Sequence, residues 1–263
     1  MAMPFFAPGS DPGPDFAELL RRSGTIPVAA MAGLDPLQIA HGTTCVAVRY
    51  ADGVVMAGDR RATAGNWISN RRIEKVFPAD RFSGVAIAGA AGPAVEMVRL
   101  FQLQLEHYEK VEGTVLSLEG KANQLSQMIR SNLPAAMAGM AVVPIFAGFD
   151  LSRSTGRLFQ YDITGGRYEE ADHTATGSGQ MHASTVIKLG WRAELSRDDT
   201  VDLVLRSLWE AADEDSATGG PDLIRGIFPI VATITADGFE TLPETELADR
   251  FRALIGRLEG GDS

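Results

Sequence analysis

Alternating apolar and polar positions begin at Thr43 and continue in short runs along most of the chain. This pattern predicts a strand over 43–50, a hairpin turn at Asp52-Gly53 and a returning strand over 54–57. Further extended segments are expected at 73–77 (ended by Pro78), 82–88, 144–150, 157–162, 168–175, 227–235 and 240–242.

Stretches with apolar residues three or four positions apart separate these strands in blocks, which predicts amphipathic helices. Strict strand–helix alternation, typical of a doubly wound parallel sheet, is missing from this order. We therefore expect an α+β fold in which antiparallel sheets pack face to face and helices cover both outer faces. The helices are expected at 93–110, 118–140 with a bend near Pro134, 181–191, 198–213 and 244–258.

Composition and charge argue against several classes of function. The chain has 263 residues and a net charge of −10, so a nucleic-acid-binding surface is not expected. The single Cys45 excludes an intramolecular disulfide and suits a reducing, cytoplasmic compartment. No apolar run reaches the ~18 residues of a membrane span, and we expect no membrane association.

The first 42 residues differ from the rest because they are rich in proline, glycine and alanine. Proline disfavours sheet formation, and only 15–22 suggests a short helix. We interpret 1–42 as a propeptide removed on maturation and 43–263 as the catalytic domain. An ordinary disordered tail is the alternative that composition alone leaves open.

The candidate chemistry lies at the junction, Gly42-Thr43-Thr44. A threonine hydroxyl is a poor nucleophile unless a base lies beside it. If the Gly42–Thr43 bond is cut, the new α-amine of Thr43 can be that base. Asp59 and Lys75 are candidate charged partners, although alone each also fits a turn residue or a solvated surface charge. Cys45 is interpreted as a packing residue.

Several short motifs follow one another along the chain. They are Gly42-Thr43-Thr44, 55–61 (VMAGDRR), Lys75-Val76, 87–89 (IAG), 105–109 (LEHYE), 177–179 (GSG) and 215–220 (DSATGG). Each motif alone is weak, but together and in this order they are specific. By these motifs the chain, from Thr43 to about Leu258, resembles a proteasome β-subunit of the bacterial, actinobacterial type, within the N-terminal-nucleophile hydrolases. The resemblance implies a four-layer αββα sandwich.

The resemblance also implies roles for individual residues. Thr43 resembles the nucleophile, Asp59 and Lys75 its charged partners, and Gly89 the glycine of the oxyanion hole. A supporting set around the terminal amine comprises Ser178, Asp215 and Thr218, where Thr218 replaces the usual serine.

A substrate-binding surface is implied by family position. Thr63 resembles the residue whose backbone pairs with an extended substrate. The side chains expected around the P1 residue are all apolar, which predicts cleavage after apolar or aromatic residues. They are Ala62, Ile73, Ile87, Ala91 and Val95.

The resemblance implies protein substrates. No cofactor is expected, and because the four histidines lack metal-ligand spacing, no metal is expected either. It also implies heptameric β-rings stacked with rings of α-subunits, and a regulatory ring ATPase acting through the α-rings. The precursor is expected to be inactive until it assembles, and 1–42 to assist or delay assembly. Two other classes remain open: an amidase for small molecules with the same nucleophile, and a catalytically silent structural subunit.

Overall fold

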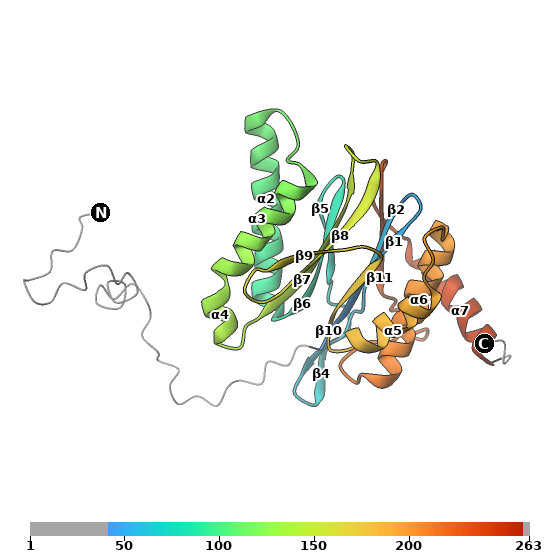
Figure 1. The fold of residues 1–263 in the computed structure, drawn as a ribbon. Helices are drawn as coiled ribbons and strands as arrows, with labels where there is room; N and C mark the ends of the chain where they lie inside the picture. The colour runs from blue at the N-terminus through green and yellow to red at the C-terminus, as the bar shows by residue number, and fades with distance from the viewer. Residues whose placement is uncertain (1–41, 260–263) are drawn as a thin grey trace, which may run out of the picture. The chain divides into compact units, whose positions relative to one another are not determined.

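Two five-stranded antiparallel sheets lie face to face between layers of helices (Figure 1). The computed structural model describes residues 42–259. The helix expected at 15–22 and the propeptide apart from Gly42 lie outside the described residues, and so does the end of the chain after Glu259.

The two sheets are built from consecutive hairpins and from strands far apart in sequence. The first has the order β10-β1-β2-β11-β12 and the second β5-β6-β7-β8-β9. The first comprises β1 (Thr44–Tyr50), β2 (Gly53–Gly58), β10 (His173–Gly177), β11 (Ile230–Thr235) and β12 (Gly238–Thr241). The second comprises β5 (Val76–Asp80), β6 (Ser83–Gly89), β7 (Val142–Asp150), β8 (Thr155–Tyr161) and β9 (Arg167–Glu170).

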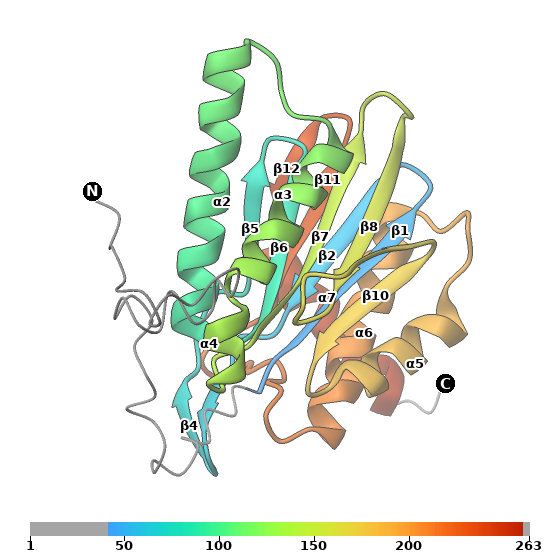
Figure 2. The same ribbon diagram turned by 60° about the vertical axis from the view of Figure 1, so that its left-hand side comes forward.

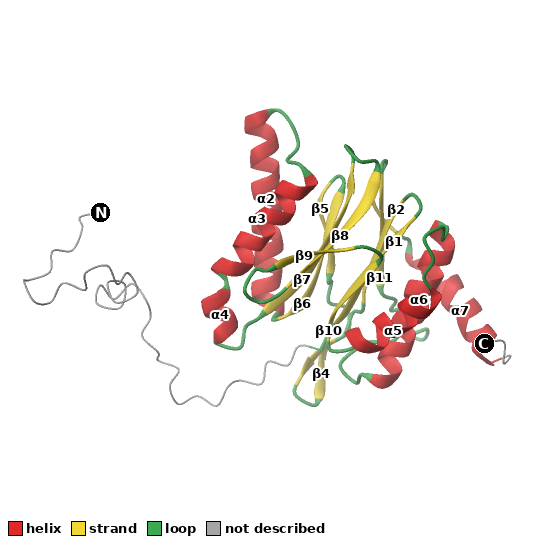
Figure 3. Cartoon of the chain, in the orientation of Figure 1, coloured by secondary structure: helices red, strands yellow, loops and turns green. Residues whose placement is uncertain are grey.

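Helices cover the outer face of each sheet (Figures 1 and 3). Three hydrophobic clusters fill the three spaces between the four layers, so the predicted αββα sandwich is confirmed. The second sheet carries α2 (Ala91–Glu112), α3 (Leu118–Ser131) and α4 (Leu133–Met137), and the first carries α5 (Gln180–Gly190), α6 (Arg197–Glu214) and α7 (Glu244–Glu259).

Strand β1 shows how the sequence pattern creates these layers. Side chains alternate between the two faces of a strand. Val46 and Val48 join the cluster beneath α5, α6 and α7. Cys45 and Ala47 join the cluster between the two sheets. Both faces of β1 are therefore buried, which fixes its register and the position of Thr43 just before it.

One strand and one helix end at other residues than expected, and each difference lies near a proline. Pro78 does not end its strand but lies inside β5. This strand is at the edge of its sheet and its pairing shifts between Pro78 and Asp80, so the missing N–H is tolerated. The helix expected over 118–140 ends at Ser131, and α4 restarts one residue before Pro134.

Two further segments were not predicted correctly. The extended segment expected over 168–175 is split, because β9 and β10 belong to different sheets and the chain crosses between them. A hairpin of β3 (Ala62–Ala64) and β4 (Trp67–Asn70) was missed, since such short strands carry little periodicity. β4 projects beyond the layers (Figure 2). No helix between residues 42 and 259 is long and apolar enough to cross a bilayer.

Candidate active site

The predicted site residues meet at one end of the two sheets. β1 runs antiparallel to both β2 and β10, so its start lies beside their ends. Thr43 therefore lies beside Asp59, which follows β2, and Ser178, which follows β10. In the second sheet, Lys75 immediately precedes β5 and Gly89 ends the paired strand β6.

Asp59 is the most heavily hydrogen-bonded group of the site, and only 1% of it is exposed. Its Oδ1 accepts from the Lys75 ammonium at 2.6 Å and from the Thr44 N–H at 2.8 Å. Its Oδ2 accepts from the N–H groups of Arg61 and Gly219, each at 2.8 Å. The carboxylate is thus fully satisfied inside the protein, as a buried charge requires.

Lys75 connects this carboxylate to the bond that precedes Thr43. Its Nζ also donates to the Arg61 carbonyl at 2.7 Å and to the Gly42 carbonyl at 3.3 Å. The Thr43 hydroxyl donates to the same Gly42 oxygen at 2.8 Å. The carbonyl before Thr43 therefore receives two donors, one of them charged.

The space around Gly42 accepts no side chain. A Cβ on Gly42 would lie 1.8 Å from the Ala217 Cβ and 2.6 Å from its Cα. The Gly42 N–H donates to the Thr63 hydroxyl at 3.3 Å. Glycine is thus the only residue that fits before Thr43 in this geometry.

A second polar group surrounds the backbone nitrogen of Thr43. This N–H donates to the Ser178 hydroxyl at 3.3 Å. Ser178 and Thr218 both donate to Oδ2 of Asp215, at 2.5 and 2.6 Å. Burial alone would raise the pKa of Asp215, but these hydroxyls and the Ala217 N–H outweigh it, so the pKa lies below its ordinary value.

Two glycines allow the backbones of the site to approach each other. Gly89 has a φ of 110°, and a Cβ there would lie 2.1 Å from the Ala141 carbonyl oxygen. Gly177 has a φ of 99°, and a Cβ there would lie 1.9 Å from the Thr43 carbonyl oxygen. Other residues rarely adopt this left-handed conformation, so both positions require glycine.

Comparison with known proteins identifies the family of this chain. A family model described as "Proteasome subunit" matches residues 39–224, which include every residue placed in the site so far. The chain belongs to the proteasome subunit family. It is similar to "Proteasome subunit beta" from Acidimicrobium ferrooxidans, 60% identical over 95% of this chain and 92% of the relative. It is also similar to "Proteasome subunit beta" from Streptomyces griseus, 53% identical over 96% of this chain and 90% of the relative.

The substrate-binding residues predicted for this proteasome subunit come from the elements that carry the site. Thr63 contacts Gly42 through its hydroxyl, in addition to the backbone role expected from the sequence. Ile87 and Val95 pack in the cluster between the second sheet and α2. The substrate role of these residues remains a prediction. Ala62 lies on β3, Ile73 between β4 and β5, Ile87 on β6, and Ala91 and Val95 on α2.

Cys45 lies close to the site but is not set up to react. It is fully buried, its thiol donates to the Ile87 carbonyl at 3.5 Å, and burial raises its pKa to about 12. A thiol with such a pKa stays protonated at neutral pH. The packing role interpreted from the sequence fits this environment.

Arg61 and Thr44 were not given roles from the sequence. The Arg61 N–H binds Asp59, its carbonyl accepts from Lys75, and its guanidinium donates to the Ser216 carbonyl at 2.9 Å. Arg61 thus joins the loop after β2 to the loop after α6. Both residues belong to the matching motifs, but only the three-dimensional contacts distinguish them from neighbours.

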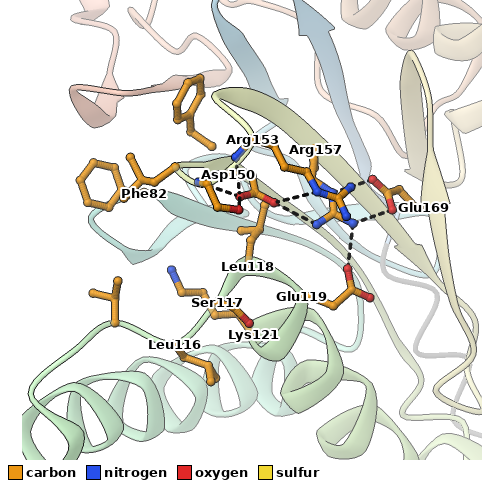
Figure 4. A pocket seen from close by; sticks show the side chains of 14 residues that line it. Phe82, Leu116, Ser117, Leu118, Glu119, Lys121, Asp150, Arg153, Arg157 and Glu169 are labelled. Atoms are coloured by element: carbon orange, nitrogen blue, oxygen red, sulfur yellow. Dashed lines mark hydrogen bonds and ion pairs between the residues drawn. The ribbon is translucent and has the colours of Figure 1, made fainter.

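A separate cavity of about 560 Å³ lies at the opposite end of the second sheet (Figure 4). At this cavity Arg157 donates to Asp150, Glu119 and Glu169 at 2.7–3.1 Å. Lys121, also at this cavity, is buried and paired with an aspartate. Because these cations are all paired, we interpret the network as structural support for the sheet rather than as part of the active site.

Proposed function

We propose that this chain is the peptidase β-subunit of a 20S proteasome core, a threonine endopeptidase in which Thr43 is the nucleophile. The observation that carries the proposal is the pair of donors on the Gly42 carbonyl, namely the Thr43 hydroxyl and the buried Lys75 ammonium. The relatives named proteasome subunit beta support it. A silent subunit would not need a buried Asp59–Lys75 pair at this position.

In peptide hydrolysis the Thr43 hydroxyl attacks the scissile carbonyl of a bound protein substrate. The free α-amine, with an ordinary pKa of about 8, accepts the hydroxyl proton and later donates it to the leaving amine. The Lys75 ammonium favours negative charge on the attacking oxygen, and Asp59 holds Lys75 in place. Water then hydrolyses the acyl ester on Thr43.

The other polar groups orient this chemistry. Ser178 donates to Asp215 and therefore accepts from the Thr43 nitrogen, which directs the amine. Thr218 fixes Asp215 from the other side. The Gly89 N–H is proposed as a donor to the developing oxyanion, a contact whose loss typically costs ~10²–10³ in rate.

Maturation uses the same groups on the chain's own Gly42–Thr43 bond. The Thr43 hydroxyl attacks the Gly42 carbonyl, whose oxygen Lys75 polarises, and the peptide bond is exchanged for an ester that water cleaves. All three N–H groups of Lys75 already have acceptors, so we assign the proton to water rather than to this amine. Cleavage would release 1–42 as a propeptide.

The assembly is part of the proposal. Family membership implies association with other proteasome subunits, and we propose stacked heptameric rings with α-subunits and a ring ATPase at the α-rings, in the cytoplasm. The apolar P1-facing side chains, Ala62 and Ile73 among them, support cleavage after apolar residues. A peptide panel in which basic P1 residues are cleaved fastest would overturn that preference.

The intact mass of the chain in assembled complexes tests the function. Wild type and Thr43→Ser, which keeps the hydroxyl, should lose residues 1–42 and hydrolyse peptides. Thr43→Ala should assemble, retain the full mass and hydrolyse nothing. Processing of Thr43→Ala, or an unprocessed and inactive wild type in complete rings, would refute the proposal.

A further inference from the structure

The side chain of Thr44 has no role in the chemistry described so far, yet it lies between the two polar groups of the site. It is completely buried. Its hydroxyl lies 2.5 Å from the Thr218 hydroxyl and accepts from the Gly179 N–H at 3.1 Å. Its own N–H donates to Asp59. Thr44 thus contacts a member of each group through different atoms.

The direction of the hydrogen bond between the two threonines follows from the neighbouring contacts. The pKa of Asp215 lies below its ordinary value, so this carboxylate is ionised and only accepts. The single hydroxyl proton of Thr218 is committed to Asp215 at 2.6 Å. Thr44 must therefore be the donor to Thr218. The protons run in one order, from Gly179 N–H through Thr44 and Thr218 to Asp215.

Gly179 shows that this contact is built into the fold. A Cβ on Gly179 would lie 2.3 Å from the Thr44 hydroxyl oxygen and 2.8 Å from that of Thr218. Any larger residue would force the two hydroxyls out of their positions. The glycine after Ser178 is thus required by the Thr44–Thr218 pair rather than by a positive φ.

We infer that the Thr44 hydroxyl is a positioning group for the reaction. It holds the Ser178–Asp215–Thr218 set at a fixed position relative to the Asp59–Lys75 pair. It does not touch the reacting atoms; it acts by fixing Thr218 and, through Asp215 and Ser178, the direction of the Thr43 amine. This inference rests on the proposed function. It predicts that removing the hydroxyl slows the chemical step without weakening substrate binding.

The test is peptide hydrolysis by assembled complexes of wild type, Thr44→Val and Thr44→Ser. Valine has nearly the shape of threonine but cannot donate, whereas serine keeps the hydroxyl. The matched control is Thr176→Val. Thr176 is also buried, lies on the neighbouring strand β10 and donates to the Val143 carbonyl at 3.1 Å, outside this network.

We expect Thr44→Val to lower kcat by about tenfold with KM within twofold of wild type, and Thr44→Ser to restore most of the rate. Thr176→Val should leave both constants near wild type. If Thr44→Val fails to assemble, Thr44→Ala and Thr44→Ser, which differ by one oxygen, give the same comparison.

Equal kcat values for Thr44→Val and Thr176→Val would overturn the inference, as would a change confined to KM. An inactive wild type, or an active Thr43→Ala, would instead show that the proposed function has failed. The two failures are therefore distinguishable in one set of measurements.

Discussion

Replacing Asp59 by asparagine tests how far the buried ion pair determines both stability and chemistry. The change keeps the shape but removes the charge opposite Lys75, whose Nζ lies 2.6 Å from Oδ1. It also places an NH₂ group where a carboxylate oxygen now accepts from two donors. Depending on which oxygen the NH₂ group replaces, either the ammonium and the Thr44 N–H or the N–H groups of Arg61 and Gly219 must then face another donor.

The magnitude follows from these contacts. Removing one partner of a buried ion pair typically costs ~3–5 kcal/mol, because the remaining charge is left unpaired. Each backbone donor that loses its acceptor adds about 1–3 kcal/mol. We therefore expect Asp59→Asn to destabilise the chain by at least ~4 kcal/mol. Lys75→Met added to Asp59→Asn removes the unpaired charge and should recover ~1–3 kcal/mol of this loss.

The assay is thermal unfolding of assembled complexes in which every chain also carries Thr43→Ala, so that none is processed. For a chain of this size 1 kcal/mol corresponds to ~2–4 °C in Tm. The order of Tm should be the reference highest, the Asp59→Asn/Lys75→Met pair intermediate and Asp59→Asn lowest. A pair that melts at or below Asp59→Asn would refute the reasoning, because the ammonium would then not be the destabilising group.

Two further predictions concern other parts of the site. Because hydrogen bonds depress the pKa of Asp215 in the folded state, its stabilising contribution is present above the unfolded value of about 3.9 and is lost as pH falls through the lower folded pKa. The Tm difference between wild type and Asp215→Asn should thus be constant from pH 7 to 5 and shrink below about pH 4; a difference that grows on acidification would contradict this sign. Gly89→Ala should reduce both stability, by at least about 1–3 kcal/mol, and peptide hydrolysis, since its φ is 110° and its Cβ would meet the Ala141 carbonyl. Gly92→Ala, with no atom within 4 Å of its Cβ, is the matched control in unfolding and hydrolysis assays and should be neutral or slightly stabilising.

The part of this architecture that sequence can predict is the part that local pattern and short motifs carry. Alternation in β1 and the glycine before Thr43 suffice to place a strand and a candidate nucleophile. The partners of Asp59 could not be predicted, because three of its four donors are backbone N–H groups that carry no residue identity. Similarly, Pro78 reads as a strand end until the sheet order shows that β5 is an edge strand.

The roles of individual site residues were equally hard to predict from the sequence. Thr44 beside Thr43 looks like an ordinary strand residue, and its link to Thr218 depends on two segments 174 positions apart. Gly179 likewise looks like a loop residue until its contact with the Thr44 hydroxyl is seen. Such roles are decided by close packing between distant segments, which periodicity does not encode.

The intact Gly42–Thr43 bond has a kinetic consequence. The polar partners of Thr43 are already in place while this bond is whole, so the proposed self-cleavage would need no refolding of the site. Self-cleavage in the assembled particle should then be first order and proceed independently in each copy. A chain lacking the Thr43 hydroxyl would stay uncut even among active neighbours, because Gly42 is enclosed by its own Thr63, Lys75 and Ala217. If the proposed maturation is correct, each subunit therefore processes only its own chain.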